Sequence, residues 1–522
     1  MRANSLDLLR YAVRRVGTRS IGPRSGQCGL RWSSSETRQW STPLAKQLAE
    51  VINTTGPVSV AAYMRQCLTS PDGGYYTRNT TDHDQFGVKG DFVTSPEISQ
   101  VFGELVGIWL YTEWLAQGQK KKVQIIEVGP GRGTLMNDVL RAISTFKHFA
   151  MSVEAIYLVE ASPHLMKQQA KLLCGTDELE THDLGWKSTC KYLPRCNIIW
   201  CEDIRFVPKE ETSTPFILAH EFFDALPIHV FQNTASSTIP ASSTILTPTG
   251  PIIPKHGPQV PKNHWHELVV SPVQSSSSTQ KGDPEEFHLT VSKSPTPHSL
   301  YLPQTSERYK ALSKIENAII EISPESLSYI SDFAIRIGGA NSAPTTPPSS
   351  QSLSSTSQVS RSSPTPPFQK ATPSGAALIL DYGPATTIPA NTLRGIRAHR
   401  PVSPFTSPGL VDLSADVDFL ALAETALSSS PGVEVHGPVE QAFFLSTMGI
   451  EERAEKLVRK AKLGKDVVAD MDDTVKRLEG GWKRLVDRGP TGMGRIYKAM
   501  AIVPYRDGVV RRPVGFGGDV VG

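Results

Sequence analysis

A glycine-rich turn between an apolar strand and a helix constrains this chain more than any other feature. Residues 124–128 are QIIEV, Gly129, Gly131 and Gly133 follow, and residues 134–140 are TLMNDVL, with apolar side chains at helical spacing. Glycine allows a positive φ and a close approach of the backbone to a ligand, and the N-terminus of the next helix offers unpaired N–H groups. The segment therefore predicts a nucleotide-binding α/β sheet.

The spacing of the glycines indicates which nucleotide. Glu127 and the three glycines form the pattern E-x-G-x-G-x-G, which is typical of proteins that bind S-adenosylmethionine. The dinucleotide fingerprint requires Gly or Ala at position 134, where this chain has Thr134. A dehydrogenase is thus the weaker interpretation, and a tight turn without a ligand is the bland alternative.

Two further acids follow two further predicted strands. Residues 155–159 precede Glu160, and residues 197–201 precede Glu202 and Asp203. Ligands of open α/β sheets collect at the carboxyl ends of the strands. We therefore expect Glu160 to accept hydrogen bonds from both ribose hydroxyls, and Asp203 to accept one from the adenine amino group. Each acid taken alone is more often the solvated end of a strand, but three consecutive strands with the expected residue favour a cofactor site.

The chain is predicted to form one interrupted α/β domain, a class I (Rossmann-like) S-adenosylmethionine-dependent methyltransferase sheet with extra helical elements and disordered insertions. Stretches rich in Ser, Thr and Pro bury too little apolar surface to offset the entropy of ordering. Between them, residues 321–339 predict a Ser-started helix and residues 376–382 a buried strand. The predicted parts are 1–35, a presequence; 41–232, the N-terminal part with the cofactor site; 233–300, an insertion region; 301–339, a globular segment; 340–375, a disordered insertion; 376–505, the C-terminal part; and 506–522, a tail.

The first 35 residues have the composition of a mitochondrial presequence. They contain seven arginines, many serines and a single acid, Asp7. Leu6, Leu9, Val13 and Val16 recur at helical spacing, which predicts a basic amphipathic helix. The sequence therefore predicts import into the mitochondrial matrix, and a disordered basic arm is the alternative.

Charge and cysteine content exclude several other classes of protein. Lysines and arginines exceed acids by 54 − 51 = 3, which gives no reason to expect a nucleic-acid partner. The six cysteines form no CxxC pair, so we expect free thiols and no metal site. No apolar stretch reaches the roughly 18 residues that a membrane span needs, so a soluble mature protein is expected. The sequence carries no signal for the oligomeric state.

A fourth predicted strand, residues 215–219, leads into the segment HEFFDALP at 220–227. With GDFVTSPEISQ at 90–100, PGLVDL at 408–413 and GMGRIYK at 492–498, this segment makes the chain similar to the MidA-type methyltransferases, from about Gly56 to Val503. The Ser/Thr/Pro-rich insertions depart from the compact family pattern. The resemblance implies S-adenosylmethionine-dependent methylation of an arginine on a core peripheral-arm iron-sulfur subunit of respiratory complex I, to symmetric dimethylarginine, in support of complex I assembly.

The chemistry of that acceptor suggests roles for the HEFFDALP segment. A guanidinium group is protonated and delocalised, so acids must hold its charge while one nitrogen faces the methyl group. Glu221 and Asp224 are our candidates for this catalytic pair, and Phe222 and Phe223 could wall the acceptor channel. The alternative is a structural turn, with Asp224 as a helix cap and both phenylalanines in the core.

Two weaker groups of candidates lie elsewhere in the chain. Thr94, Ser95 and Glu97 could bind the methionine portion of the cofactor, or Ser95 could cap a helix that has Pro96 in its first turn. The basic loop residues that could meet acids of the substrate are Arg394, Arg397, His399 and Arg400.

Two other functions compete with methylation of a protein arginine. The fold could serve as an assembly chaperone that binds the complex I subunit and uses the cofactor only for stability, or it could methylate a different acceptor. The fold alone does not decide, because the same sheet serves many acceptors.

Overall fold

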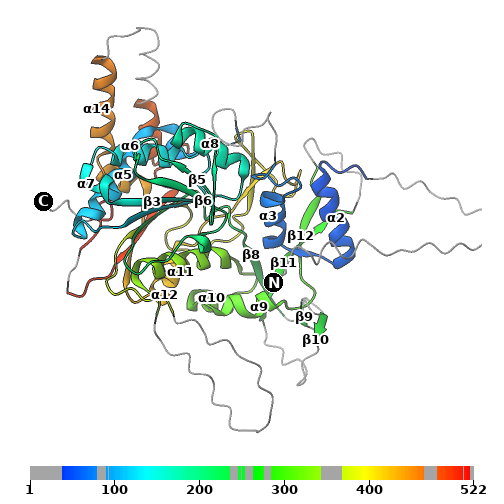
Figure 1. Ribbon diagram of the computed structural model, residues 1–522. Coiled ribbons are helices and arrows are strands. Elements are labelled where there is room, and N and C mark those ends of the chain that lie inside the picture. Colours follow the sequence, from blue (N-terminus) through cyan, green and yellow to red (C-terminus); the bar gives the residue numbers. More distant parts are fainter. Residues whose placement is uncertain are drawn as a thin grey trace, which may run out of the picture. The chain divides into compact units, whose positions relative to one another are not determined.

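The predicted strands lie side by side in one nine-stranded sheet of order β18-β19-β14-β7-β2-β3-β6-β5-β4 (Figure 1). Its five central strands are parallel: β14 (Ala376–Tyr382), β7 (Thr214–His220), β2 (Val123–Val128), β3 (Val153–Val159) and β6 (Asn197–Cys201). The antiparallel edges are β19 (Tyr497–Pro504) and β18 (Val433–Glu440) on one side, and β5 (Gly185–Thr189) and β4 (Glu180–His182) on the other. All four strands that precede the predicted site residues are thus neighbours with the same direction.

The computed structural model describes residues 38–78, 90–91, 93–235, 245–247, 250–252, 263–274, 284–341, 367–463, 479–508 and 511–517. Trp40–Gly522 forms one compact unit. The predicted presequence lies outside the described residues. No helix among the described residues is long and apolar enough to cross a membrane.

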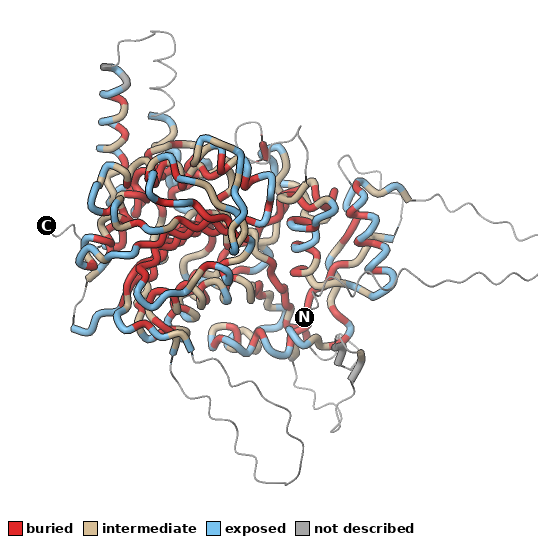
Figure 2. Tube along the Cα trace, viewed as in Figure 1, coloured by how far each residue is buried: buried red, intermediate tan, exposed pale blue. Residues whose placement is uncertain are grey.

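Apolar side chains of the central strands point alternately to the two faces of the sheet, and a hydrophobic core lies on each face. Val123 and Ile125 of β2 pack with α5 (Gln100–Ala116), α6 (Thr134–Ile143) and α8 (Pro163–Cys174), because successive side chains of a strand point to opposite faces. Ile126 and Val128 pack with α11 (Pro324–Gly338) and α12 (Phe419–Ser429). Figure 2 shows the strands as a continuous buried layer between these helices. The sheet is therefore covered on both faces, as a parallel sheet requires.

A second sheet has the order β1-β11-β8-β13, with β12 paired to β11. Its strands are β1 (Val58–Ser59), β8 (His229–Ala235), β11 (Asn263–Pro272), β12 (Phe287–Val291) and β13 (Ile319–Ile322). Helices α2 (Pro43–Thr55) and α3 (Val60–Thr69) share a hydrophobic core with it. Within the predicted insertion region at 233–300, the described residues therefore include two paired strands of this sheet.

Apart from the 14-residue helix α14, the remaining elements are short. The helices are α4 (Ser95–Ile98), α7 (Lys147–Ser152), η2 (Ile204–Phe206), α9 (Pro297–Tyr301), η3 (Leu302–Gln304), α10 (Glu307–Leu312), α13 (Gln441–Thr447) and α14 (Ile450–Leu463). The strands are β9 (Ile245–Thr247) and β10 (Gly250–Ile252), a hairpin, and β15 (Arg394–Arg397), β16 (Arg400–Val402) and β17 (Asp412–Ser414), a small sheet.

Two predicted boundaries shift in the structure. The Ser-started helix is confirmed as α11, with Ser323 as its N-cap, but Glu321 belongs to β13. Of the predicted disordered insertion 340–375, residues 342–366 lie outside the described residues. Residues 367–375 are described and are attached to the fold through Lys370, whose ammonium group is buried and donates to the carbonyls of Arg336 and Ser374. The folded chain therefore resumes at 367 and not at 376.

Candidate functional site

A cavity of about 340 Å³ lies where the carboxyl ends of the parallel strands meet. Segments that follow β2, β3, β6 and β7 all contribute to its wall, which is where an open α/β sheet binds ligands. The predicted site residues that line the cavity are Thr94, Glu97, Glu127, Gly129, Gly131, Glu160, Glu221, Phe222 and Asp224. One cavity thus contains most of the predicted cofactor site and both predicted acceptor acids.

The glycine turn has the conformation that its sequence predicts. Gly129, Gly131 and Gly133 have φ angles of 63°, 53° and 83°, a region that L-residues with a side chain rarely adopt. The Gln169 amide donates to the Gly131 carbonyl at 2.6 Å, which ties the turn to α8. The turn leads directly into α6, whose first residue is Thr134. A backbone path close to a ligand is therefore built into the fold.

Glu160 and Glu127 are buried acceptors beside this turn. Glu160 Oε1 accepts from the Ser162 N–H at 2.7 Å, and Oε2 accepts from the Gln169 amide at 3.1 Å. Burial raises the pKa of Glu160 to about 7 and that of Glu127 to about 8, with the neighbouring Glu160 as a second cause for Glu127. Glu127 Oε2 has no hydrogen-bond donor among the described residues. An orphaned buried acceptor is costly, so these residues fit a ligand that brings donors such as ribose hydroxyls.

Asp203 is not brought to the cavity. Its carboxylate accepts from the Arg205 backbone N–H at 2.8 Å and pairs with the Arg205 guanidinium at 2.6 Å, so it caps the short helix η2. Glu202, the preceding residue, lines the cavity instead. The acid that reaches the cavity after β6 is therefore Glu202 and not the predicted Asp203, because the chain turns away after position 202.

The segment before α5 forms the short helix α4, and its cap is Thr94 and not the predicted Ser95. Glu97 Oε2 accepts from the Thr94 N–H at 3.2 Å, and Glu97 Oε1 lies 3.4 Å from Arg132 Nη1. The Ser95 N–H donates to Glu221 Oε1 at 3.4 Å, while the Ser95 hydroxyl is buried without a partner among the described residues. The segment thus serves both as a helix start and as a wall of the cavity.

The turn after β7 is held by a single buried carboxylate. Asp381 Oδ2 accepts from the backbone N–H groups of Phe222, Phe223 and Asp224, at 3.1, 2.9 and 3.4 Å. Glu221 has a φ of 46° and a side chain that is 9% exposed. Strained backbone of this kind persists only where the surroundings fix it, which Asp381 does here.

Asp224 is buried beside tyrosines in the same cavity. The Tyr382 hydroxyl donates to Asp224 Oδ2 at 2.5 Å, and Asp224 Oδ1 has no partner among the described residues. Burial raises the pKa of Asp224 to about 6, the Tyr382 hydrogen bond opposes that rise, and the charge of Glu221 adds to it. Asp412, which accepts from the Tyr76 hydroxyl at 2.9 Å, and Tyr497 also line this part.

The two phenylalanines of the turn have different positions. Phe222 lines the cavity, as predicted, whereas Phe223 is 3% exposed and packs in the core with Ile330 and Phe333. The prediction that both phenylalanines wall the channel is therefore wrong for Phe223, because consecutive side chains of this turn point in different directions.

The basic loop residues lie outside the cavity lining. Arg394 pairs with Asp416 at 2.7 Å, and its guanidinium carbon lies 4.6 Å from the centre of the Tyr382 ring. Ile396 is the residue of this strand that lines the cavity, while Arg397, His399 and Arg400 do not. Arg394 therefore packs against the Tyr382 ring and is not itself part of the cavity lining.

Four polar side chains that line the same cavity as Asp224 were not predicted from the sequence: Tyr76, Tyr382, Asp412 and Tyr497. A signal existed for Tyr382, because the predicted strand 376–382 ends in Asp381 and Tyr382 at the same edge as the other site residues. Asp412 lies in the PGLVDL segment, where its neighbours gave no chemical clue.

Comparisons with known proteins agree with this geometry. The sequence model of a family of S-adenosyl-L-methionine-dependent methyltransferases matches residues 105–439. The protein arginine methyltransferase NDUFAF7, mitochondrial, from Danio rerio is 35% identical over 80% of this chain and 78% of its own length. The protein of that name from Homo sapiens is 31% identical over 89% and 84%. A COG1565 superfamily member from Burkholderia thailandensis, bound to S-adenosyl-homocysteine, has a similar fold, with a TM-score of 0.59, 19% identity, and 92% and 96% of the two chains covered.

Proposed function

Since this chain belongs to the family of S-adenosyl-L-methionine-dependent methyltransferases, we propose that it methylates arginine side chains of a protein in mitochondria. Relatives that match most of the chain are named mitochondrial protein arginine methyltransferases. The cofactor, S-adenosyl-L-methionine, supplies an electrophilic methyl group when bound. The methyl acceptor and the residues that bind it are assigned from the lining of the cavity.

The glycine-turn half of the cavity is the proposed cofactor half. Glu160 would accept from the ribose hydroxyls, since both of its oxygens are already oriented by Ser162 and Gln169. Glu127, with its orphaned oxygen, would accept a further donor of the cofactor. Thr94 and Glu202 also line the cavity, and we assign both to the cofactor half.

One observation carries the assignment of the acceptor: Glu221 and Asp224 face the same cavity as Glu160, and Tyr76, Tyr382, Tyr497 and Asp412 line the cavity with them. Two buried carboxyl groups suit a cation with several N–H donors, and a guanidinium group has five of them in a planar fork. Phe222 offers an aromatic wall on which such a plane can pack. A neutral acceptor would leave this excess of buried acid uncompensated.

These groups also account for the proton that leaves during methylation. The guanidinium group is protonated at neutral pH and must lose a proton from the nitrogen that is methylated. Asp224 has a pKa of about 6 and a free Oδ1, so its carboxylate can accept that proton at neutral pH. Glu221 would then hold the remaining positive charge and orient the nucleophilic nitrogen.

The finer part of the proposal follows from the resemblance to the MidA-type methyltransferases. It assigns the substrate as a core peripheral-arm subunit of respiratory complex I, the product as symmetric dimethylarginine and the compartment as the matrix. The acid-rich cavity supports an arginine acceptor, whichever protein carries it.

The experiment separates the two halves of the cavity. Glu221→Gln and Asp224→Asn remove charge from the acceptor half, so methyl transfer to the subunit should fall by at least about 100-fold while cofactor affinity changes only a few-fold. Glu160→Gln should weaken cofactor binding instead. Glu178→Gln, at an exposed acid outside the cavity, is the control. Labelled methyl transfer, mass spectrometry of the modified arginine and calorimetric cofactor titration are the measurements.

Two results would overturn the proposal. Wild-type rates in both acceptor-half variants would make the segment a structural turn. A wild-type protein that binds cofactor but never modifies the subunit would favour the assembly-chaperone function, or a different acceptor if methyl transfer occurs elsewhere.

A further inference from the structure

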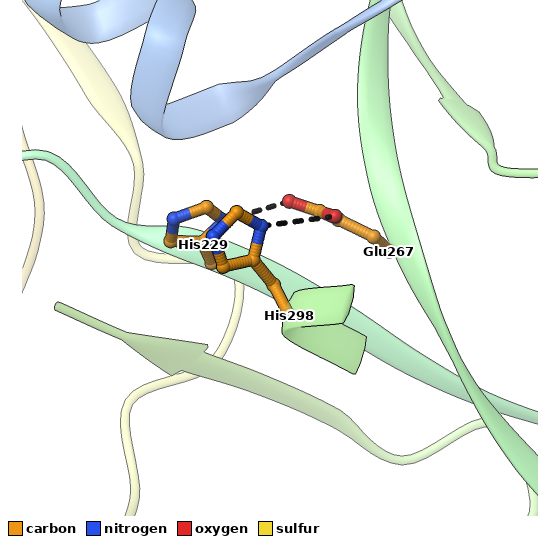
Figure 3. Close-up of side chains that lie close together, drawn as sticks. All are labelled: His229, Glu267 and His298. Atoms are coloured by element: carbon orange, nitrogen blue, oxygen red, sulfur yellow. Dashed lines mark hydrogen bonds and ion pairs between the residues drawn. The ribbon is translucent and has the colours of Figure 1, made fainter. Parts of the chain in front are cut away.

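Three side chains that can bind a metal ion meet at the second sheet (Figure 3). None of them lines the cavity at the carboxyl ends of the parallel strands. His229 begins β8, Glu267 lies in β11, and His298 is the second residue of α9. Their nitrogen and carboxylate oxygen atoms all lie within 4.8 Å of one another. The cluster thus joins residues from three elements.

The register of the sheet explains why these residues meet. Glu267 pairs with Phe231 across the antiparallel strands β8 and β11. His229 is two residues from Phe231, so its side chain points to the same face of the sheet as that of Glu267. Helix α9 begins with a capping box formed by Thr296 and Ser299, which places His298 in the first turn, over that face.

Burial and charge distinguish the cluster from an ordinary surface group. Glu267 is 2% exposed, and within the described part of the chain its ion pairs are with the two histidines and with no lysine or arginine. The Nδ1 atom of His229 lies 2.7 Å from Glu267 Oε1, and the two imidazole rings have centroids 4.1 Å apart. A buried carboxylate between two imidazoles lacks a permanent positive charge, which a divalent cation would supply.

A neighbouring hydroxyl group already orients the carboxylate. Thr296 Oγ1 donates to Glu267 Oε2 at 2.5 Å. This contact fixes the carboxylate, while Oε1 and His229 Nδ1, which now share a hydrogen bond, would both turn to the metal ion. Metal sites commonly hold their carboxylates by a second hydrogen bond of this kind.

We propose that His229, Glu267 and His298 bind a divalent transition-metal ion, and that Zn²⁺ is the ion the donors suit. Two imidazoles and one carboxylate form a common protein ligand set of Zn²⁺, with a fourth position left to water. Tetrahedral bonds of about 2.0–2.2 Å place the donor atoms roughly 3.4 Å apart, so modest side-chain rotations bring these donors into range. The side chain of His298 is 52% exposed, which gives solvent access to the fourth position.

The bound ion would fasten α9 to strands β8 and β11. Strand β8 begins five residues after Asp224, so the same strand connects the metal site to the turn that holds the acceptor acids. The ion would take no part in methyl transfer, since the three ligands lie outside the cavity where that step is placed.

The test uses the full chain and Zn²⁺ alone. Metal-stripped protein should bind one Zn²⁺ per chain, measured by competition with a chromophoric chelator and by elemental analysis, and its melting temperature should rise with Zn²⁺. His298→Gln changes a half-exposed side chain and should weaken Zn²⁺ binding at least about tenfold and abolish that rise. His148→Gln, at an exposed histidine of α7, should leave both unchanged.

Absorption spectra of the Co²⁺-substituted protein test the ligand set independently. Co²⁺ bound by two imidazoles and a carboxylate with four-coordinate geometry should give visible absorption bands that His298→Gln removes and His148→Gln keeps. Equal Zn²⁺ affinity in wild type and His298→Gln, or no stoichiometric binding by the wild type, would overturn the proposal and leave a buried His–Glu hydrogen bond. His298→Gln decides the outcome because it changes a half-exposed side chain and leaves the buried ligands in place.

Discussion

Gly129 lies against the ring of Phe222, so closely that a Cβ at position 129 would come within 2.6 Å of Phe222 Cδ2. The glycine turn after β2 and the acid-bearing turn after β7 therefore touch at this point. A side chain at position 129 would therefore displace the Phe222 ring, and the contact connects the two proposed halves of the cavity.

Gly129→Ala should lower affinity for S-adenosyl-L-methionine at least about tenfold, because the new methyl group displaces Phe222 and the φ of 63° disfavours alanine. Calorimetry on the folded variant measures the change. Gly118→Ala is the matched control, since Gly118 also has a positive φ but has open space where a Cβ would stand. Equal cofactor affinities for the two variants would contradict the role of the contact.

Cofactor affinity should rise with pH through about 7. Burial raises the pKa of Glu160 to about 7 in the free protein, and hydroxyl donors of the cofactor favour the carboxylate form. Binding therefore releases a proton. If only the carboxylate binds, the dissociation constant should fall about tenfold between pH 6 and pH 8. Titrations at both pH values test this, and Glu160→Gln should bind the cofactor more weakly at both and lose the part of the pH dependence that Glu160 contributes.

Tyr382→Phe should move the acid limb of the pH profile to higher pH. In the wild type, kcat/KM should fall below about pH 6, because Asp224 is then protonated and can no longer accept the proton of the guanidinium group. Loss of the hydroxyl removes a hydrogen bond that favours the carboxylate, worth about 1 kcal/mol or roughly 0.7 pH unit. Tyr505→Phe, at a half-exposed tyrosine outside the cavity, is the control. A limb that stays in place or moves to lower pH would refute the assignment.

Asp381→Ala should lower the free energy of unfolding by roughly 2–4 kcal/mol, because three backbone N–H groups of the 222–224 turn lose their acceptor. Asp381→Asn keeps one oxygen acceptor and should lose less than half as much. Urea unfolding of both variants provides the comparison. Equal losses would mean that the remaining oxygen of asparagine does not serve as the acceptor of these N–H groups, which would contradict the prediction.

Deletion of residues 342–366 should leave the melting temperature within about 3 °C of the wild type. The Ala340 N–H donates to the Phe368 carbonyl at 2.8 Å, so the two flanks already lie at hydrogen-bonding distance and a short turn can join them. A deletion that extends to 372 also removes buried Lys370 and should cost several degrees more. Thermal melts of the two deletion variants measure this. An equally large drop in melting temperature for the shorter deletion would show that 342–366 is packed.

The redox state of five cysteines was predicted from the sequence, whereas their burial was not. Cys67, Cys174, Cys190, Cys196 and Cys201 are free thiols, as their spacing predicts, and Cys28 lies outside the described residues. Burial, a property that the spacing did not contain, raises the pKa of Cys67 to about 12, so this thiol is inert at neutral pH.

The sequence by itself determined the elements that are stabilised locally. The apolar runs gave β2, β3, β6, β7 and β14, and the glycines gave the turn before α6. These features depend on side-chain periodicity and on backbone conformations that few residues tolerate, so they can be recognised from neighbouring positions alone. The placement of Glu160 and Glu221 in one cavity followed from the rule that parallel strands end at one edge.

Only the tertiary structure decided which other side chains join that cavity. Tyr382 reaches Asp224 across a separation of 158 positions, and Asp203 turns away to cap η2 although its strand ends at the expected edge. His229, Glu267 and His298 meet only because two strands pair in one register and a helix caps them. Such contacts depend on long-range packing and strand register, and no local pattern in a sequence encodes either of them.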